Sequence, residues 1–344
     1  MQAIHLLVVY IINGFYALAL PNRRSLNIFT TPRTLSNCTE KYGDQPATPI
    51  VSLNNIFTIL NYCADISGHV IRLDFTDSND DPRQACLLIT SFQNTLPLLV
   101  WLHPSIFPSG TIVFTNLLSE AYTANLTGTA DGPLGYHLLL PFGRNTTHVY
   151  PSPDDQGLGW DNWYRNYNRS DPTLNVDVET LDYFINQVVN HQSNMFHIDK
   201  SRVFMSGWSN GAAMAVQYTL NTPGIAAAAV YSAPDPYRDY KDPCAQIPYP
   251  SYLTPVRILY NQCDIINICA TGMAFINDLN KRYMNNLTAE GIIIDSLLEI
   301  TSTCNLNCTD EFGLGLMQHS RWPTLLNDKI FFEFFRQHSL VSNK

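Results

Sequence analysis

The segment Ser201–Leu220, SRVFMSGWSNGAAMAVQYTL, constrains the fold more than any other part of the sequence. A short apolar run leads into Gly-Trp-Ser-Asn-Gly at 207–211, and a stretch of small residues that suits a helix follows. A Gly-x-Ser-x-Gly pattern where a strand passes into a helix is typical of a tight turn that lifts a serine above the end of a sheet. The flanking glycines fit this turn because larger side chains would clash there. The segment therefore predicts a strand, a strained turn at Ser209 and a helix behind it.

The rest of the chain alternates between strand-like and helix-like segments. Continuous apolar runs suit strands buried on both faces, and apolar residues at helical spacing suit helices that cover a sheet. We expect further strands over 69–75, 85–90, 96–104, 135–143, 225–234, 255–264 and 291–300, further helices over 115–126, 175–192, 272–287 and 327–340, and a long loop over 150–172. This alternation predicts a single α/β domain with a mostly parallel central sheet and helices on both faces.

Composition and charge argue against two classes of protein. The chain has 344 residues, of which 45% are hydrophobic and 14% charged, and this is too apolar a composition for a disordered protein. The formal net charge is −9, and no basic stripe or run occurs in the sequence. We therefore expect no nucleic-acid partner.

The N-terminal stretch MQAIHLLVVYIINGFYALAL resembles a secretory signal. Its apolar part ends in Ala17-Leu18-Ala19, a small-x-small triplet of the kind that signal peptidase accepts. The alternative is an uncleaved anchor, but the stretch is short and is interrupted by Asn13 and Gly14. We expect a signal peptide over 1–19, an irregular arm over 20–68 and a catalytic domain over 69–344. The protein would then be secreted, extracellular and without stable membrane association.

Cysteine usage fits an oxidising compartment. The eight cysteines are an even number, which in an exported chain predicts up to four disulfides of undetermined pairing. The pairs at 263/269 and 304/308 could be taken for halves of a zinc site, but no nearby histidine completes a ligand set, so we expect no metal. Six Asn-x-Ser/Thr sequons agree weakly with a glycoprotein.

A serine hydroxyl at position 209 would need a base and an acid to act as a nucleophile. In a fold of this kind, the partners follow the serine in the order acid, then histidine. Asp264 closes the apolar run 255–264 and is the expected acid, while Asp235 and Asp310 are rivals. Of the two histidines that follow Asp264, His319 lies on an expected loop and is the expected base.

The other histidine that follows Asp264, His338, falls within the amphipathic final helix and is expected to be structural.

An oxyanion hole would need two N–H donors. The first expected donor is the amide of Asn210, directly after the serine. The second should follow the run 96–104, near Ser105 or Ile106, because Pro104 has no N–H to donate.

Four segments, in order, resemble the secreted α/β-hydrolase esterases related to feruloyl esterases and polyhydroxybutyrate depolymerases. These are LPLLVWLHPS, FHIDKSRVFMSGWSNGAAM, TPVRILYNQCD and HSRWP, which resemble the oxyanion strand, the serine turn, the acid strand and the segment around the base. GWDNWY and the Phe-rich final helix add to the likeness, which covers roughly residues 69–340. The resemblance implies the α/β-hydrolase fold, with Ser209, Asp264 and His319 as the catalytic triad and Asn210 and Ser105 at the oxyanion hole.

The chain departs from that family at Pro104, where the family usually has glycine, and this leaves the second oxyanion donor open. Four tryptophans fall on expected loops near the catalytic edge: Trp160, Trp163, Trp208 and Trp322. Aromatic side chains at such a place can bind a substrate or pack loops onto the core, and the sequence leaves both roles open.

The sequence therefore predicts a secreted serine carboxylic-ester hydrolase that forms an acyl-enzyme and needs no cofactor. By the resemblance, its substrate would be a feruloyl or acetyl ester of plant polysaccharide, or a hydroxyalkanoate polyester, and we expect a monomer. The alternatives are a non-catalytic binding protein that keeps the hydrolase fold, and a serine peptidase.

Overall fold

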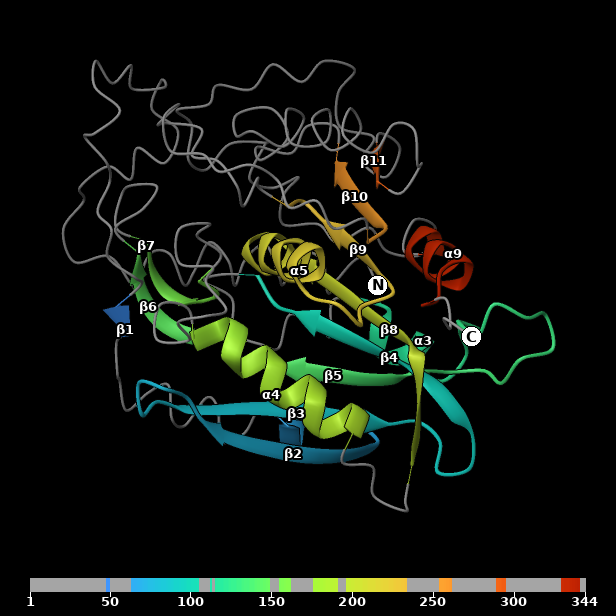
Figure 1. The fold of residues 1–344 in the computed structure, drawn as a ribbon, viewed down its shortest axis with the longest axis horizontal. Coiled ribbons are helices and arrows are strands. Elements are labelled where there is room, and N and C mark those ends of the chain that lie inside the picture. Colours follow the sequence, from blue (N-terminus) through green and yellow to red (C-terminus); the bar gives the residue numbers. More distant parts are fainter. Residues whose placement is uncertain are drawn as a thin grey trace, which may run out of the picture.

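A central sheet organises the chain, as Figure 1 shows. The computed structural model describes residues 48–49, 63–104, 112, 115–148, 155–161, 176–190, 196–233, 254–261, 289–294 and 329–340. The sheet has eight strands in the order β11-β10-β9-β8-β4-β5-β3-β2. Their bounds are β2 His69–Thr76, β3 Pro82–Ile89, β4 Thr95–Leu102, β5 His137–Pro141, β8 His197–Trp208, β9 Ala227–Tyr231, β10 Val256–Asn261 and β11 Ala289–Ile294.

Strand direction identifies the fold. β5, β4, β8, β9, β10 and β11 form a continuous parallel set, and β3 runs antiparallel to both of its neighbours, β2 and β5. This strand order, with one antiparallel strand second from the edge, is that of the α/β-hydrolase fold. The predicted fold class is therefore confirmed. The parallel strands also explain why β4 and β5 are continuous apolar runs, because both of their faces are covered.

The helices cover both faces of the sheet. They are α3 Leu117–Glu120, α4 Val176–Asn190, α5 Asn210–Asn221 and α9 Lys329–Gln337, with a short 3₁₀ helix, η1, at Cys63–Asp65. Alternate strand residues pack with α4 and α5 on one face, among them Leu87, Leu98, Val100, Val203, Met205 and Val230. Their sequence neighbours pack with α3 and α9 on the other face, among them Leu88, Leu99, Trp101, Phe204, Ala227 and Ala229. None of the helices within the described ranges is long and apolar enough to cross a membrane.

Two expected elements differ from the structure. The helix expected over 115–126 is reduced to α3, because the Ala121 and Ala124 carbonyls accept hydrogen bonds from the Tyr136 and Gly135 amides in place of the next helical turn. Asn125 accepts a hydrogen bond from the Thr127 amide and donates to the Thr129 carbonyl. The loop expected over 150–172 contains strand β7 (Asp155–Gly159), which pairs antiparallel with β6 (Arg144–His148) and so joins a small sheet with β1 (Thr48–Pro49). The helix expected over 272–287 lies outside the described residues.

Helix α9 is docked by its aromatic face and by two arginines from the sheet. Its side chains Phe331, Phe332, Phe334 and Phe335 are all buried. The Arg257 guanidinium lies 4.6 Å from the centre of the Phe334 ring, and it also donates to the Ile330 carbonyl. Arg202 donates to the His338 carbonyl at the other end of the helix. These contacts fix the element that follows the segment with the predicted base.

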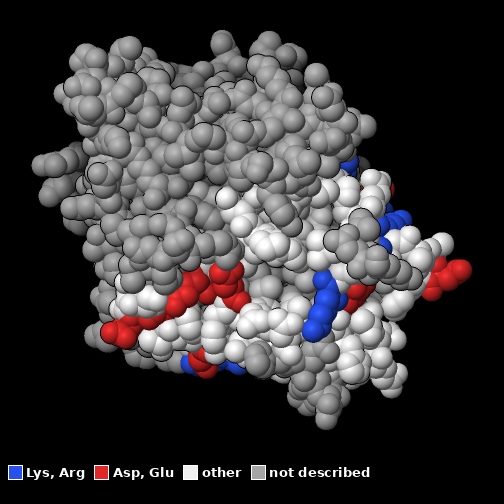
Figure 2. All heavy atoms as spheres, viewed as in Figure 1, with Lys and Arg blue, Asp and Glu red and all other residues white. Residues whose placement is uncertain are grey.

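Figure 2 shows that acidic and basic side chains are distributed differently over this face of the molecule. Acidic groups gather in a row along one side of the described surface, whereas Lys and Arg are scattered over it. No basic stripe lies on the described part of that face.

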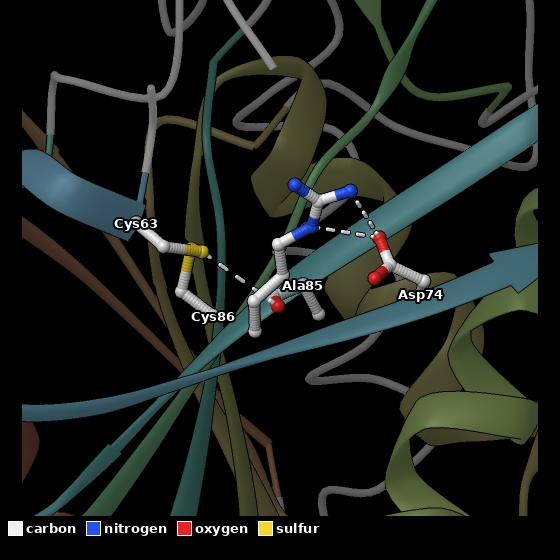
Figure 3. Close-up of a disulfide and its surroundings, with 5 residues drawn as sticks. Cys63, Asp74, Ala85 and Cys86 are labelled. Carbon is white, nitrogen blue, oxygen red and sulfur yellow. Dashed lines mark hydrogen bonds and ion pairs between the residues drawn. A yellow bond between two sulfur atoms is a disulfide. The ribbon is translucent and has the colours of Figure 1, made fainter. Parts of the chain in front are cut away.

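A disulfide joins Cys63 of η1 to Cys86 of β3 (Figure 3). The two Cα atoms are 5.4 Å apart, which is within the usual range for a disulfide. Cys86 is fully buried, so the bond ties the expected N-terminal arm to the interior of the sheet. The other six cysteines lie outside the described residues.

Cys63 and Cys86 are 23 residues apart in the sequence. Replacing both with alanine should destabilise the protein by about 3 kcal/mol, because the unfolded chain loses a cross-link that closes a loop of this length. Urea unfolding of the wild type and the double variant measures the difference. Peptide mapping without reduction provides an independent check. Recovery of Cys63 and Cys86 each joined to another cysteine would contradict the structure.

Candidate active site

Ser209 lies at the junction between β8 and α5 with φ 57° and ψ −121°. This backbone region is sparsely populated for residues other than glycine and costs about 1–3 kcal/mol, so the surroundings must hold it. The Ser209 amide donates to the Tyr231 carbonyl at 3.0 Å, and its carbonyl accepts from the Ala213 amide at 3.0 Å. The Ser209 side chain does not cap α5, although serine is a favoured capping residue. The structure therefore contains the strained turn that the sequence predicts.

The glycines on either side of Ser209 allow backbone to pack directly on backbone. A Cβ at Gly207 would lie 2.6 Å from the Gly211 carbonyl oxygen. A Cβ at Gly211 would lie 2.3 Å from the His103 oxygen and 2.4 Å from the Leu102 oxygen. The first turn of α5 therefore rests on the end of β4, the strand that leads to the expected oxyanion loop.

Gly211→Ala should destabilise the protein by more than about 2 kcal/mol, because its methyl group would collide with two carbonyl groups of the backbone. Gly224→Ala is the matched control. It has φ +92° and nothing within 4 Å of its Cβ, so only the cost of a left-handed backbone is expected, about 1 kcal/mol. Urea midpoints of the two variants compare these costs. Equal destabilisation would contradict the close packing of α5 on β4.

His103 follows β4 and is fully buried. Its Nε2 accepts a hydrogen bond from the Gly143 amide at 2.9 Å, so the ring proton is assigned to Nδ1, which lies 2.8 Å from the Pro104 carbonyl oxygen and donates to it. Burial lowers the pKa of His103 to about 4. The neutral ring therefore joins the end of β5 to the start of the expected oxyanion loop.

A second buried histidine, His137, lies at the start of β5, far along the strand from this edge. Burial lowers its pKa to about 4 as well, and its Nε2 lies 3.3 Å from the His197 carbonyl oxygen. Both rings are thus neutral in the folded protein and take up a proton more readily when the chain unfolds.

Stability should fall as the pH falls from about 6.5 towards 4, because the unfolded state binds these two protons at a higher pH than the folded state. Each histidine can contribute up to about 3 kcal/mol to this loss. Chemical unfolding at several pH values measures the slope, and NMR titration of the two rings assigns it. A ring that titrates with a pKa near 6.5 in the folded protein would contradict the burial of that histidine.

Asn210 and Trp160 are joined by a reciprocal pair of hydrogen bonds. The Trp160 amide donates to Asn210 Oδ1 at 2.7 Å, and Asn210 Nδ2 donates to the Trp160 carbonyl at 2.9 Å. The Trp160 indole N–H donates to the His103 carbonyl at 3.0 Å. These bonds connect the residue after Ser209 with the residue after β4.

Trp160 is 0% exposed and Trp208 is 6% exposed. From the sequence, either residue could contact substrate or pack a loop onto the core. The structure packs Trp160 against His103, with ring centres 5.2 Å apart, and Trp208 beside Tyr231, with ring centres 6.1 Å apart. The Trp160 side chain is fully covered and its indole N–H bonds to the backbone, so it has the packing role in this structure, and contact of either residue with substrate stays a prediction.

A buried group of charges lies next to Trp160. Arg83 forms ion pairs with Asp77 and Asp177, and the Asp161 amide donates to the carboxylate of Asp177 at 2.5 Å. Burial alone would raise the pKa of Asp177, but Arg83, Arg144 and the Asp161 amide outweigh it and lower that pKa overall. The sequence alone did not predict this group, and its one signal there was a charged residue, Arg83, two residues before the apolar run that begins at Ala85.

The remaining predicted site residues, Ser105, Trp163, Asp264, His319 and Trp322, lie outside the described residues. The strands next to Asp264 in the sequence are described by the structure. β10 ends at Asn261, three residues before Asp264, and β9 is the one strand between β10 and β8. Because the carboxyl ends of these parallel strands share one edge, Asp264 follows a strand that ends at the edge where Ser209 lies.

His338 is placed away from Ser209. Its carbonyl accepts a hydrogen bond from Arg202, and its ring packs on Phe334 with ring centres 4.5 Å apart. Arg202 precedes Ser209 by seven residues of extended strand, roughly 20 Å at about 3.3 Å each. His338 therefore lies towards the amino ends of the parallel strands, away from the carboxyl ends where Ser209 lies, and has a structural role.

Comparison with known proteins gives distant structural likenesses. No family model and no curated protein sequence matches the chain. Similar solved structures include an esterase from Pyrococcus furiosus, with 12% identity, a TM-score of 0.41 and coverage of 73% of this chain and 90% of that chain. An S-formylglutathione hydrolase from Agrobacterium tumefaciens has 11% identity, a TM-score of 0.45 and coverage of 67% and 87%.

A dienelactone hydrolase from Anabaena variabilis has 12% identity, a TM-score of 0.42 and coverage of 79% of this chain and 98% of that chain. At such low identities and TM-scores these likenesses carry no information about activity. The fold assignment rests on the strand order and on the backbone at Ser209.

Proposed function

We propose that this protein is a serine carboxylic-ester hydrolase with Ser209 as the nucleophile. The observation that carries the proposal is the strained backbone of Ser209 between β8 and α5. Folded proteins keep such strain where the surrounding structure holds it, and it clusters at functional sites. At this position the turn sets the serine at the N-terminus of α5, whose amides and positive dipole end favour a developing negative charge.

In the proposed reaction, Ser209 Oγ attacks the ester carbonyl carbon while His319 takes the hydroxyl proton. The Asn210 amide donates to the resulting oxyanion. His319 then gives the proton to the leaving alcohol, and an acyl-enzyme remains. Water attacks the acyl group in the same way, releases the acid and restores the serine. Asp264 holds the imidazole in the required tautomer, and no metal or cofactor takes part.

The positions of neighbouring elements support the choice of partners for Ser209. Asp264 follows a strand that ends at the same edge of the sheet as Ser209. His319 precedes α9, which four buried phenylalanines and two arginines fix on the sheet. The alternative base, His338, is held at the opposite edge.

The finer parts of the proposal concern location and substrate. We propose that the protein is secreted, and the disulfide between Cys63 and Cys86 supports this, because such bonds persist in oxidising compartments. We also propose feruloyl or acetyl esters of plant polysaccharide, or hydroxyalkanoate polyesters, as substrates. The support for this substrate class is the resemblance of the segments around positions 103, 209, 264 and 319 to esterases of that group.

Ser209→Ala, Asp264→Asn and His319→Gln should each lower kcat for p-nitrophenyl acetate by about a hundredfold or more, with loss of Ser209 the most severe. A fluorophosphonate probe should label the wild type and not Ser209→Ala. His338→Gln serves as the matched control for His319→Gln and should retain kcat.

The same assays separate the alternatives. A folded wild type that hydrolyses neither p-nitrophenyl acetate nor a panel of feruloyl, acetyl-xylan and hydroxyalkanoate esters, and that the probe does not label, would point to a binding protein. Labelling with hydrolysis of peptides alone would indicate a peptidase.

A further inference from the structure

We propose that the side chains of Asn210 and Trp160 are positioning residues that set the start of the oxyanion loop, an inference that rests on the proposed function. Asn210 is named above for its backbone amide, and Trp160 as a candidate for contact with substrate. Their side chains form a chain of hydrogen bonds from the residue after the nucleophile to the last part of β4.

The first link is the carboxamide of Asn210. It uses both its oxygen and its nitrogen on the main chain of one residue, Trp160, at 2.7 and 2.9 Å. Two bonds of this kind fix the orientation of the bound segment as well as its distance. Because Asn210 is the first residue of α5, the segment at Trp160 is held directly against the helix end that faces the expected oxyanion.

The second link is the indole of Trp160. Its N–H donates to the His103 carbonyl, which lies in a fully buried residue and would otherwise need another donor. An unsatisfied buried carbonyl costs about 1–3 kcal/mol, so loss of this bond favours a shift of the peptide. His103 is followed by Pro104, which has no N–H, so the orientation of this peptide decides where the next amides along the chain point.

The third link anchors the same segment from the other side. The Asp161 amide donates to Asp177, whose carboxylate is paired with Arg83 in a fully buried site. Residues 160–161 are therefore held between α5 and the start of α4. Because Asp177 and Arg83 are both buried, solvent does not compete for these bonds, and the Trp160 indole is held in one position.

Loss of these hydrogen bonds should weaken the stabilisation of the transition state by the oxyanion donors. Oxyanion donors must lie about 2.7–3.1 Å from the developing charge, and a displacement of about 1 Å can cost a hundredfold in rate. The charge that these donors stabilise develops only in the transition state. Loosening the chain of bonds should therefore lower kcat and leave KM nearly unchanged.

The chain offers a matched control for a change at Trp160. Trp101 is also a fully buried tryptophan, and it lies on β4 two residues before His103. It packs on the opposite face of the sheet, and its indole N–H has no hydrogen-bond partner. Trp160→Phe and Trp101→Phe thus remove the same atoms, but only the former removes a hydrogen bond.

We expect Trp160→Phe to lower kcat for p-nitrophenyl acetate about 10- to 100-fold with KM changed less than about threefold, and Trp101→Phe to change kcat less than about threefold. Asn210→Ala should give a loss similar to that of Trp160→Phe. The double variant should lose little more than the larger single variant, because both residues act through one chain of contacts. Thermal unfolding confirms that each variant is folded, and if Trp160→Phe does not fold, Asn210→Ala decides.

The outcomes distinguish the two proposals. Equal kcat for Trp160→Phe and Trp101→Phe in an active enzyme, a loss confined to KM, or a double variant whose loss is the product of the single losses would overturn the positioning role. The ester hydrolase would then still stand. A wild type that neither turns over esters nor reacts with the fluorophosphonate probe would overturn the proposed function and the positioning role with it.

Discussion

The direct contact between the first turn of α5 and the end of β4 is the constraint on which this site depends. The backbone at Gly211 lies so close to the carbonyl groups of Leu102 and His103 that no side chain fits between them. That closeness brings the strand before the expected oxyanion loop to the residue after Ser209. It also requires the abrupt change of direction that Ser209 makes with its positive φ. The strain at Ser209 is thus the local cost of packing a helix start on a strand end.

Three polar side chains next to this contact are hydrogen-bonded, whereas several other buried polar atoms of the described residues are not. His103, Trp160 and Asn210 bond to one another or to the main chain. On the opposite face of the sheet, the Trp101 indole and the Ser206 hydroxyl are buried without a hydrogen-bond partner. A buried polar group is costly unless it is bonded, so the bonds of His103, Trp160 and Asn210 favour one arrangement of this part of the chain over its alternatives.

Much of the fold was predictable because strands that are buried on both faces have continuous apolar sequences. The apolar runs at 96–104, 135–143 and 225–234 correspond to β4, β5 and β9, and helical spacing over 175–192 corresponds to α4. The helix expected over 115–126 was wrong in extent, since the Ala121 and Ala124 carbonyls bond to the Tyr136 and Gly135 amides, and apolar spacing does not record such distant partners. Strand β7 was missed, because its residues, DQGLG, carry no apolar alternation.

The strands of the central sheet and the turn at Ser209 could be predicted from the sequence alone, because the spacing of apolar residues and the glycines at 207 and 211 act over a few neighbouring residues. The hydrogen bond of the Trp160 indole and the buried group of Arg83, Asp77 and Asp177 became evident only in the folded chain. The bonds from Trp160 to His103 and from Arg83 to Asp177 join residues far apart in the chain, and each depends on which polar group finds a partner once water is excluded. A tryptophan between Gly159 and Asp161 looks the same in sequence whether its indole contacts a substrate or a carbonyl group.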